Sequence, residues 1–345
     1  MQHEALPREA VMQSCRTRYR IIGVFLLLVV TNGWIAVDGA AADRKIVYRL
    51  KWLINASTAG DLFSQEYGFF SKHGLNVILK AGGPERDAIR ELELGYAQFG
   101  VASADQVIRA LAKGASVVVL AQLFQINPLQ WIYRADDLSL NQVKDLAGLT
   151  VGITYGGNDE TIMRALLARF AMADGQVRLA SVRYDYTPFF QREVVVWPVY
   201  RNTQGIYLSD KLAAAGERAA FFDPSAHGIR FVANSVVTSK KMIDRYPQAV
   251  ERFTQALMAG WRAAMATDNE DAVVQSLTAH DRDTPSSVIR RQLAVTRQMV
   301  QPDATVALGR IDKPAWEQTE QIMLQQRLIS GPVNVVDRLS SPLAP

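Results

Sequence analysis

The stretch LTVGITYGGNDETIMRALLARFAMA, residues 149–173, decides the fold of this chain. Alternating apolar residues over 151–155 predict a short strand, and Gly156 and Gly157 allow the tight turn that follows. Asn158 is a good helix N-cap, and the apolar spacing after it predicts a helix to the end of the stretch. Strand, glycine-rich turn and helix N-terminus are typical of open α/β folds, whose ligands bind beyond the carboxyl ends of the strands.

Two carboxylates, Asp159 and Glu160, fall in the first turn of this predicted helix. There they complement the helix dipole, but they would repel a bare phosphate, sulfate or sulfonate. One interpretation is a well-capped helix that touches no ligand. The other is a ligand that brings hydrogen-bond donors or positive charge, such as an aminopyrimidine, with Glu160 as the partner of its amine. The turn matches neither a P-loop nor a Gly-x-Gly-x-x-Gly fingerprint.

The composition is that of an ordinary globular protein. Of the 345 residues, 49% are hydrophobic and 21% are charged, and this length predicts two domains with a sizeable core. The net charge is +4, and no run of lysine or arginine follows the N-terminal segment. The charge pattern therefore indicates no nucleic-acid partner, and we expect a monomer.

The N-terminal segment has the pattern of a targeting sequence. Three arginines over 16–20 precede an apolar run over 21–30, and three alanines at 40–42 offer a cleavage site. The run is shorter than the roughly 20 residues that a spanning helix needs. The pattern favours a cleaved signal peptide over 1–42 and a periplasmic protein, with an uncleaved anchor as the alternative. Cys15 is the only cysteine, so a mature chain would have no disulfide and no cysteine metal site.

Strands and helices alternate from Asp43 to about residue 231, and the remainder is mostly helical. Strands are expected at 46–52, 75–81, 96–103, 116–124, 151–155, 177–183 and 194–200. Helices are expected at 59–73, 84–94 (opened by Pro84), 105–113, 140–147, 161–173, 203–215, 247–266, 269–279, 286–300 and 314–327. This rhythm predicts an α/β protein of two lobes, each a mostly parallel sheet flanked by helices. Such lobes close around a ligand by hinge motion.

Three runs carry a resemblance to a known family: KWLINASTAGDLFSQEYGFFSKHGLNVIL (51–79), AQFGVASADQVIRALAKGA (97–115) and GLTVGITYGGNDETIMRALL (148–167). In order and spacing they resemble the periplasmic solute-binding proteins of ABC importers, in the branch related to the thiamine-pyrimidine synthases. The resemblance covers about residues 44–237.

The resemblance implies a type II periplasmic-binding-protein fold, with lobe one over 43–133 plus 232–345 and lobe two over 134–231. It also implies capture of a small cyclic solute, such as a thiamine pyrimidine precursor or riboflavin, and its delivery to an ABC permease in the inner membrane. More distant relatives bind sulfonates or nitrate, which stays an alternative.

The same family contains enzymes, so the residues must decide between binding and catalysis. The eukaryotic-type synthases carry Gly-x-Lys-x-x-x-His, in which the lysine holds pyridoxal phosphate and the histidine is consumed. Here Gly100 matches, but Ala102 and Gln106 stand at the lysine and histidine positions, which excludes that chemistry there. No metal-binding or nucleophile motif is present either. We therefore expect no enzyme activity, no cofactor and no metal.

Residues at the ends of predicted strands are the candidate ligand contacts. Aromatic rings there can stack on a flat heterocycle, and a few polar groups on an apolar wall are typical of a small-molecule pocket. Any single aromatic can instead be core, which is how Trp261 and Trp316 are interpreted, and Trp131 is interpreted as core or hinge. The predicted contacts are Trp52, Asn55, Ser103, Gln125, Asn127, Tyr155, Gly156, Gly157, Asn158, Asp159, Glu160, Trp197, Tyr200 and Asn202.

Overall fold

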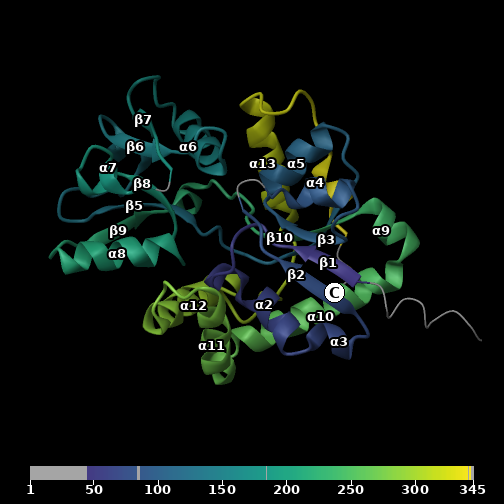
Figure 1. The fold of residues 1–345 in the computed structure, drawn as a ribbon. Helices are drawn as coiled ribbons and strands as arrows, with labels where there is room; N and C mark the ends of the chain where they lie inside the picture. Colours follow the sequence, from purple (N-terminus) through teal and green to yellow (C-terminus); the bar gives the residue numbers. More distant parts are fainter. Residues whose placement is uncertain (1–44, 84–85, 184, 341, 343–345) are drawn as a thin grey trace, which may run out of the picture. The chain divides into compact units, whose positions relative to one another are not determined.

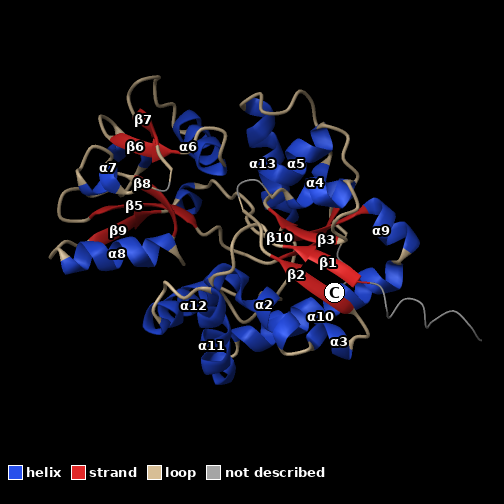
Figure 2. Cartoon of the chain, viewed as in Figure 1, coloured by secondary structure: helices blue, strands red, loops and turns tan. Residues whose placement is uncertain are grey.

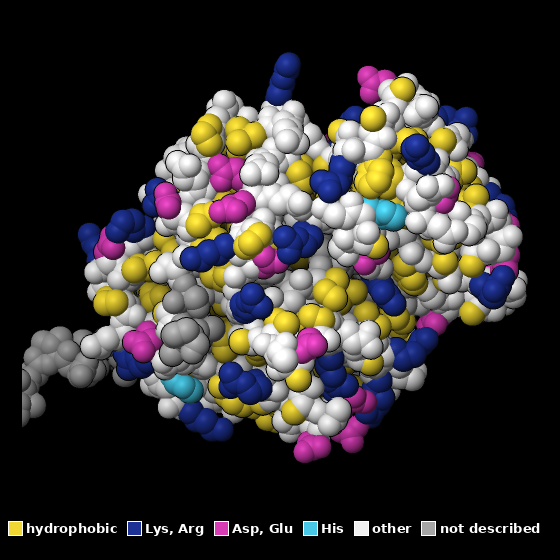
Figure 3. All heavy atoms as spheres, turned by 180° about the vertical axis from the view of Figure 1, so that it is seen from behind, with side chains coloured by type: hydrophobic (Ala, Val, Ile, Leu, Met, Phe, Trp, Pro, Cys, Tyr) yellow, Lys and Arg dark blue, Asp and Glu magenta, His cyan; other side chains and the backbone are white. Residues whose placement is uncertain are grey.

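The computed structural model describes residues 45–83, 86–183, 185–340 and 342 (Figure 1). The predicted signal peptide and Pro84 lie outside the described residues. None of the described helices is both long and apolar enough to cross a bilayer. On the face that Figure 3 shows, acidic and basic side chains are interspersed rather than gathered by sign.

The first lobe is built on a five-stranded sheet of order β2-β1-β3-β10-β4. Its strands are β1 (Lys45–Arg49), β2 (Asn76–Lys80), β3 (Phe99–Ala102), β4 (Val117–Gln122) and β10 (Ser235–Ser239). Strand β1 pairs in parallel with β2 and β3, because a helical connection returns the chain between them. Strand β10 arrives after the second lobe and is antiparallel to both β3 and β4.

The second lobe has a three-stranded sheet of order β8-β5-β9 and a two-stranded pair β6-β7. Its strands are β5 (Leu129–Arg134), β6 (Thr150–Ile153), β7 (Arg178–Ser181), β8 (Trp197–Tyr200) and β9 (Ala219–Phe222). The expected parallel pairing occurs in β6-β7, but β5 is antiparallel to β8 and β9. The chain enters the second lobe along β5, and both β8 and β9 run in the opposite direction to it. The sequence puts residues up to 133 in lobe one, whereas this pairing places β5 in the second-lobe sheet.

Helices cover both faces of the first-lobe sheet and surround the second (Figure 2). They are η1 (Ala56–Thr58), α2 (Ala59–Glu66), α3 (Phe69–Lys72), α4 (Ala88–Glu93), α5 (Ala104–Ala112), η2 (Val143–Leu146), α6 (Asn158–Arg169), α7 (Thr187–Phe190), α8 (Gln204–Ala214), η3 (Pro224–His227), α9 (Lys240–Arg245), α10 (Pro247–Met265), η4 (Thr267–Asn269), α11 (Glu270–His280), α12 (Ser286–Val300), α13 (Lys313–Gln325) and η5 (Val335–Arg338).

Three helix starts or ends differ from the sequence prediction. The helix expected over 59–73 is divided at Gly68, whose φ of 74° is left-handed and favours glycine. The helix expected from Pro84 begins later, after the N-cap Asp87. Asn158 is the first residue of α6, and Gly157 is its N-cap. A left-handed glycine sets the first boundary, and the side chain of Asp87, which accepts from Ile89 N and Arg90 N, caps the start of α4.

The cores confirm the tryptophans that were interpreted as structural. Trp131, Trp261 and Trp316 are each 0% exposed. On one face of the first-lobe sheet, Phe253 of α10 stacks on Phe99 of β3, with the ring centroids 3.6 Å apart. Helices α4, α5 and α13 pack on the other face. The first-lobe sheet is thus packed between helices on both faces.

Two segments cross between the lobes, over 123–128 and over 229–234. They are tied together where Asn127 Nδ2 donates to the main-chain oxygen of Phe231 at 2.8 Å. The predicted contact Asn127 therefore joins the crossing segments. The four C-terminal helices return to the first lobe, but Ile322 of α13 packs within the second-lobe core.

Candidate functional site

Asn202 joins the two lobes. It follows β8 in the second lobe and is 0% exposed. Its Nδ2 donates to Ser57 Oγ and to Thr296 Oγ1, each at 2.9 Å, so it reaches both η1 and α12. Its Oδ1 is buried and has no hydrogen-bond partner among the described residues. A buried side-chain carbonyl without a donor is costly, so this oxygen is a ready acceptor for a ligand.

A second contact between the lobes lies beside it. Lys51 Nζ donates to Tyr200 Oη at 3.2 Å, and the ammonium lies 5.9 Å from the centroid of that ring. Tyr200 is half-buried, as is the neighbouring Trp52. The ends of β1 and β8 therefore bring one cation and the Tyr200 ring to the junction between the lobes, and Trp52 follows Lys51 in the chain.

The turn between β6 and α6 is braced by its own carboxylates. Asp159 Oδ2 accepts from the main-chain N–H of Thr154 at 2.6 Å. Glu160 Oε2 accepts from Gly156 N at 2.7 Å, and Glu160 Oε1 accepts from Arg164 Nε at 2.8 Å. Both carboxylate oxygens of Glu160 are thus engaged within the turn and its helix, so a ligand amine would have to share them.

The two carboxylates also differ in pKa. Burial raises the pKa of Asp159, against the hydrogen bonds from Thr154. Burial acts in the same sense on Glu160, but the hydrogen bond from Gly156 and the neighbouring arginines lower its pKa overall. One of those arginines, Arg109, belongs to α5 of the first lobe. The charge of a first-lobe side chain is therefore felt at the second-lobe turn.

Tyr155 is the exposed aromatic of this turn, with 57% of its surface accessible. Gly156 follows with a φ of 79°, which a residue with a side chain would adopt only with strain. At Gly157 a Cβ would lie 2.3 Å from Asp159 Oδ1. The two glycines are thus required by the backbone of the turn and by the buried aspartate.

The predicted contacts Asn55 and Ser103 both cap helices. Asn55 Oδ1 accepts from Ser57 N at 2.8 Å at the start of η1. Ser103 Oγ donates to Asp105 Oδ1 at 2.6 Å at the start of α5. Gln125 lies in a crossing segment and donates through Nε2 to the main-chain oxygens of Gln122 and Arg310, each at 2.9 Å.

Trp197 lies in the second-lobe core and is 1% exposed. It packs against Phe189 and Tyr186, with ring centroids 6.1 and 5.9 Å away. Trp197 and Tyr200 are three residues apart in one strand, so they point to opposite faces. The sequence prediction set both at the ligand, and the alternation of the strand leaves only Tyr200 at the junction.

Several residues at the junction were missed by the sequence reasoning. Lys51 and Ser57 flank predicted contacts, so a wider reading of that turn would have found them. Thr296 lies in the middle of α12, and nothing in the local sequence marks it. Only the packing of α12 beside the end of β8 brings it to Asn202.

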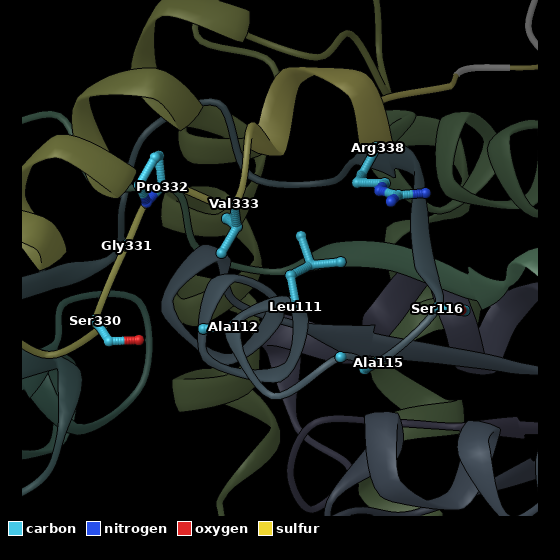
Figure 4. Close-up of a pocket in the computed structure, with 10 residues that line it drawn as sticks. Leu111, Ala112, Ala115, Ser116, Ser330, Gly331, Pro332, Val333 and Arg338 are labelled. Atoms are coloured by element: carbon cyan, nitrogen blue, oxygen red, sulfur yellow. The ribbon is translucent and has the colours of Figure 1, made fainter.

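Two surface hollows lie away from these residues. One, of about 310 Å³, lies between the end of α5 and the segment 330–338, with Arg338 and Ser330 on its walls (Figure 4). The other, of about 380 Å³, lies between α6 and α13. Neither is lined by a predicted ligand contact. Among the described residues no cluster of His, Cys, Asp and Glu is suited to a metal ion.

Sequence comparisons return the following relatives. A family model described as NMT1/THI5 like matches residues 55–271. The riboflavin-binding protein RibY of Chloroflexus aurantiacus is 23% identical over 326 residues, 88% of this chain and 86% of that protein. A putative thiamine biosynthesis protein of Haemophilus influenzae is 25% identical over 240 residues, 64% of this chain and 73% of that protein.

Structure comparisons concern the fold. The periplasmic aliphatic sulphonate binding protein SsuA of Escherichia coli matches with a TM-score of 0.68 at 14% identity, over 87% of this chain and 93% of that chain. The desulfurization enzyme DSZB matches with a TM-score of 0.55 at 14% identity, over 86% and 96%. The chain therefore has the two-lobe α/β fold of periplasmic binding proteins. Because that fold carries both binding proteins and an enzyme, function must be argued from the site.

Proposed function

This chain belongs to the NMT1/THI5-like family, and we propose that it is the substrate-binding protein of an ABC importer. It captures a small cyclic solute between its lobes, closes by hinge rotation and delivers the solute to a permease in the inner membrane. It works in the periplasm as a monomer. The two-lobe fold and the names of its relatives support this role.

The observation that carries the proposal is the position of Asn202. It is fully buried where η1, α12 and the end of β8 meet, and it keeps one acceptor oxygen free of donors among the described residues. An acceptor of this kind favours a solute with N–H or O–H donors. Tyr200 ends β8 and Trp52 follows β1, and each offers a ring for stacking on a heterocycle. A thiamine pyrimidine precursor or a similar donor-bearing heterocycle fits these groups.

A second candidate solute is an anion, such as a sulfonate or nitrate. It is favoured by Lys51, whose ammonium donates to the neutral hydroxyl of Tyr200. Arg109 adds a further first-lobe cation near the α6 turn. Asp159 and Glu160 oppose this candidate, since both carboxylates lie in that turn.

The alternative of synthase activity is opposed by the two residues at the lysine and histidine positions of the synthases, Ala102 and Gln106. Ala102 ends β3 and is 1% exposed. Gln106 Oε1 accepts from the main-chain N–H of Ser103 and so completes the cap of α5. Both positions have structural roles without a reactive group, and we propose that binding proceeds with no covalent step.

Thermal unfolding with a panel of solutes tests the proposal. The panel contains aminopyrimidine precursors, thiamine, riboflavin, taurine and nitrate. A specific solute at 100 times its Kd adds about 2.7 kcal/mol to the free energy of unfolding, which raises Tm measurably. The shift should be lost in Asn202→Ala and kept in Asn141→Ala, since Asn141 is an exposed second-lobe amide that bonds Ser139 locally.

The variant Lys51→Met separates the two solute classes. A shift caused by a pyrimidine or flavin and kept in Lys51→Met supports the donor-bearing heterocycle. A shift caused only by taurine or nitrate and lost in Lys51→Met supports the anion. No shift with any member, or a shift that Asn202→Ala leaves intact, contradicts the site described here.

A further inference from the structure

Two groups of contacts join the lobes on different sides of the crossing segments. On the α13 side, Gln318 Nε2 donates to the main-chain oxygen of Gly228 at 3.1 Å, and Arg230 N donates to Gln318 Oε1 at 2.6 Å. Arg230 lies in the crossing segment 229–234, and Gly228 directly precedes that segment. These bonds are therefore close to any axis about which the lobes rotate.

On the α12 side the contacts extend farther from the crossing. Asn202 bonds Ser57 and Thr296, as described above. Beyond it, Arg291 of α12 binds Asp210 of α8 through both guanidinium nitrogens: Nη1 donates to Oδ1 at 2.7 Å, and Nη2 donates to Oδ2. A planar guanidinium on both carboxylate oxygens is a specific, directional pairing.

The distance from the crossing makes the Asp210–Arg291 pair sensitive to lobe rotation. Helix α8 begins just after Arg201, whose N–H donates to the oxygen of Pro128 in a crossing segment at 2.8 Å. Asp210 is the seventh residue of α8, about 10 Å along the helix axis. A hinge rotation of about 20° would move its carboxylate by about 3 Å, enough to break both hydrogen bonds.

We propose that Asp210 and Arg291 form a closure latch that holds the two lobes shut without touching the solute. The latch sets how often the lobes open, and therefore how fast any solute enters and leaves. It goes beyond the proposed function, because it acts whatever the solute is and acts also when none is present.

The neighbouring arginine provides a matched comparison. Arg290 lies next to Arg291 on α12 and is similarly exposed, with 44% of its side-chain surface accessible against 51%. Its partners, Glu270 and Asp271, belong to α11 and not to the second lobe. Removing Arg290 therefore deletes an equivalent ion pair while leaving the contact between the lobes in place.

The test is a distance measurement on the full chain without solute. Cys15 is the only cysteine, so Cys15→Ser allows labelling at two introduced cysteines. Lys113→Cys in the first lobe and Asp174→Cys in the second replace exposed residues. Double electron–electron resonance between spin labels at these sites reports the populations of closed and open lobes.

Arg291→Ala should raise the ratio of open to closed lobes by up to about fivefold, and Arg290→Ala should leave it unchanged. The exchanged pair Asp210→Arg with Arg291→Asp should restore the wild-type distribution, provided circular dichroism shows folded protein. Identical distributions in Arg291→Ala and Arg290→Ala overturn the latch. Because no solute is used, that result would leave the binding proposal standing, and a failed solute panel would leave the latch standing.

Discussion

Each lobe buries an aspartate in the first turn of the helix that follows one of its parallel strands, and the two aspartates are used differently. Asp61 of α2 is 1% exposed, and Asp159 of α6 is 4% exposed. Asp61 Oδ1 accepts from Tyr48 Oη at 2.7 Å and from Trp261 Nε1 at 3.1 Å. Asp159 instead accepts from Thr154 N, five residues away in its own turn.

The difference shows that an aspartate in the first turn of a helix can bind either residues distant in the sequence or its own turn. Asp61 ties β1 to α10, which is 200 residues away in the sequence. Gly60 allows this approach, because a Cβ there would lie 2.0 Å from the Trp261 ring. Asp159 stabilises only the turn from which it comes. Asp61 is therefore a tertiary contact within the first lobe, and Asp159 is a local brace in the second.

The largest expected effect is a pH dependence that belongs to Asp61. Burial raises the pKa of Asp61 to about 7, so the folded state binds a proton that the unfolded state releases above pH 4. The free energy of unfolding therefore falls as pH rises towards 7. Asp61→Asn keeps the accepting oxygen and removes the titration. Relative to wild type, this variant should gain about 3 kcal/mol between pH 5 and pH 8 in urea unfolding.

Asp145, an aspartate whose pKa is lowered rather than raised, is the control for this effect. Hydrogen bonds from the main-chain N–H groups of Gln142 and Asn141 lower the pKa of Asp145. The lowered pKa keeps Asp145 ionised between pH 5 and pH 8, so Asp145→Asn should show no change relative to wild type over that range. If Asp61→Asn behaves like Asp145→Asn, the pKa of Asp61 is not raised by its burial.

The second effect probes the local brace. Asp159→Ala removes the buried carboxylate that accepts from the main-chain N–H of Thr154 and braces the turn, which should cost about 2 kcal/mol. Glu160 lies in the same turn and is partly buried, but its ion-pair partner Arg164 is exposed, so Glu160→Ala should cost less than about 1 kcal/mol. Urea unfolding at pH 7 measures both. Equal losses would mean that burial does not distinguish the two carboxylates.

The smallest effect tests the contact between the lobes against a contact within one lobe. Thr296 and Thr254 are both 0% exposed, and each hydroxyl donates to a carbonyl four residues earlier at 2.8 Å. Only Thr296 also accepts from Asn202. Thr296→Val should therefore cost about 1 kcal/mol more than Thr254→Val in urea unfolding. An equal cost would show that the Asn202 bond contributes nothing to stability.

Much of the first-lobe architecture could be predicted from local sequence. The helix expected over 247–266 occurs as α10, and the one expected over 286–300 occurs as α12. Long periodic stretches allow this because one apolar face determines the element. The division of the helix expected over 59–73 at Gly68 could not be predicted, since glycine also occurs inside helices and only the backbone turn reveals it.

The candidate site was harder to predict, because the same residue types that contact solutes also pack in cores and cap turns. Tyr200 and Asn202 contact the first lobe, whereas Trp197 lies in the second-lobe core. The glycine-rich turn and its two carboxylates together predicted ligand contacts at the turn before α6. There the carboxylates bind their own backbone, which a sequence pattern does not distinguish from binding a solute.

The sequence by itself determined the alternation of strands and helices and the family. It also showed that Ala102 and Gln106 stand where the synthases carry lysine and histidine. These features depend only on local pattern and residue type. Only the tertiary structure decided that Asn202 meets Thr296 and that Asp210 meets Arg291. Those pairs are 94 and 81 residues apart. No local periodicity relates such positions, and the packing of α12 beside α8 alone brings their polar atoms within hydrogen-bonding distance.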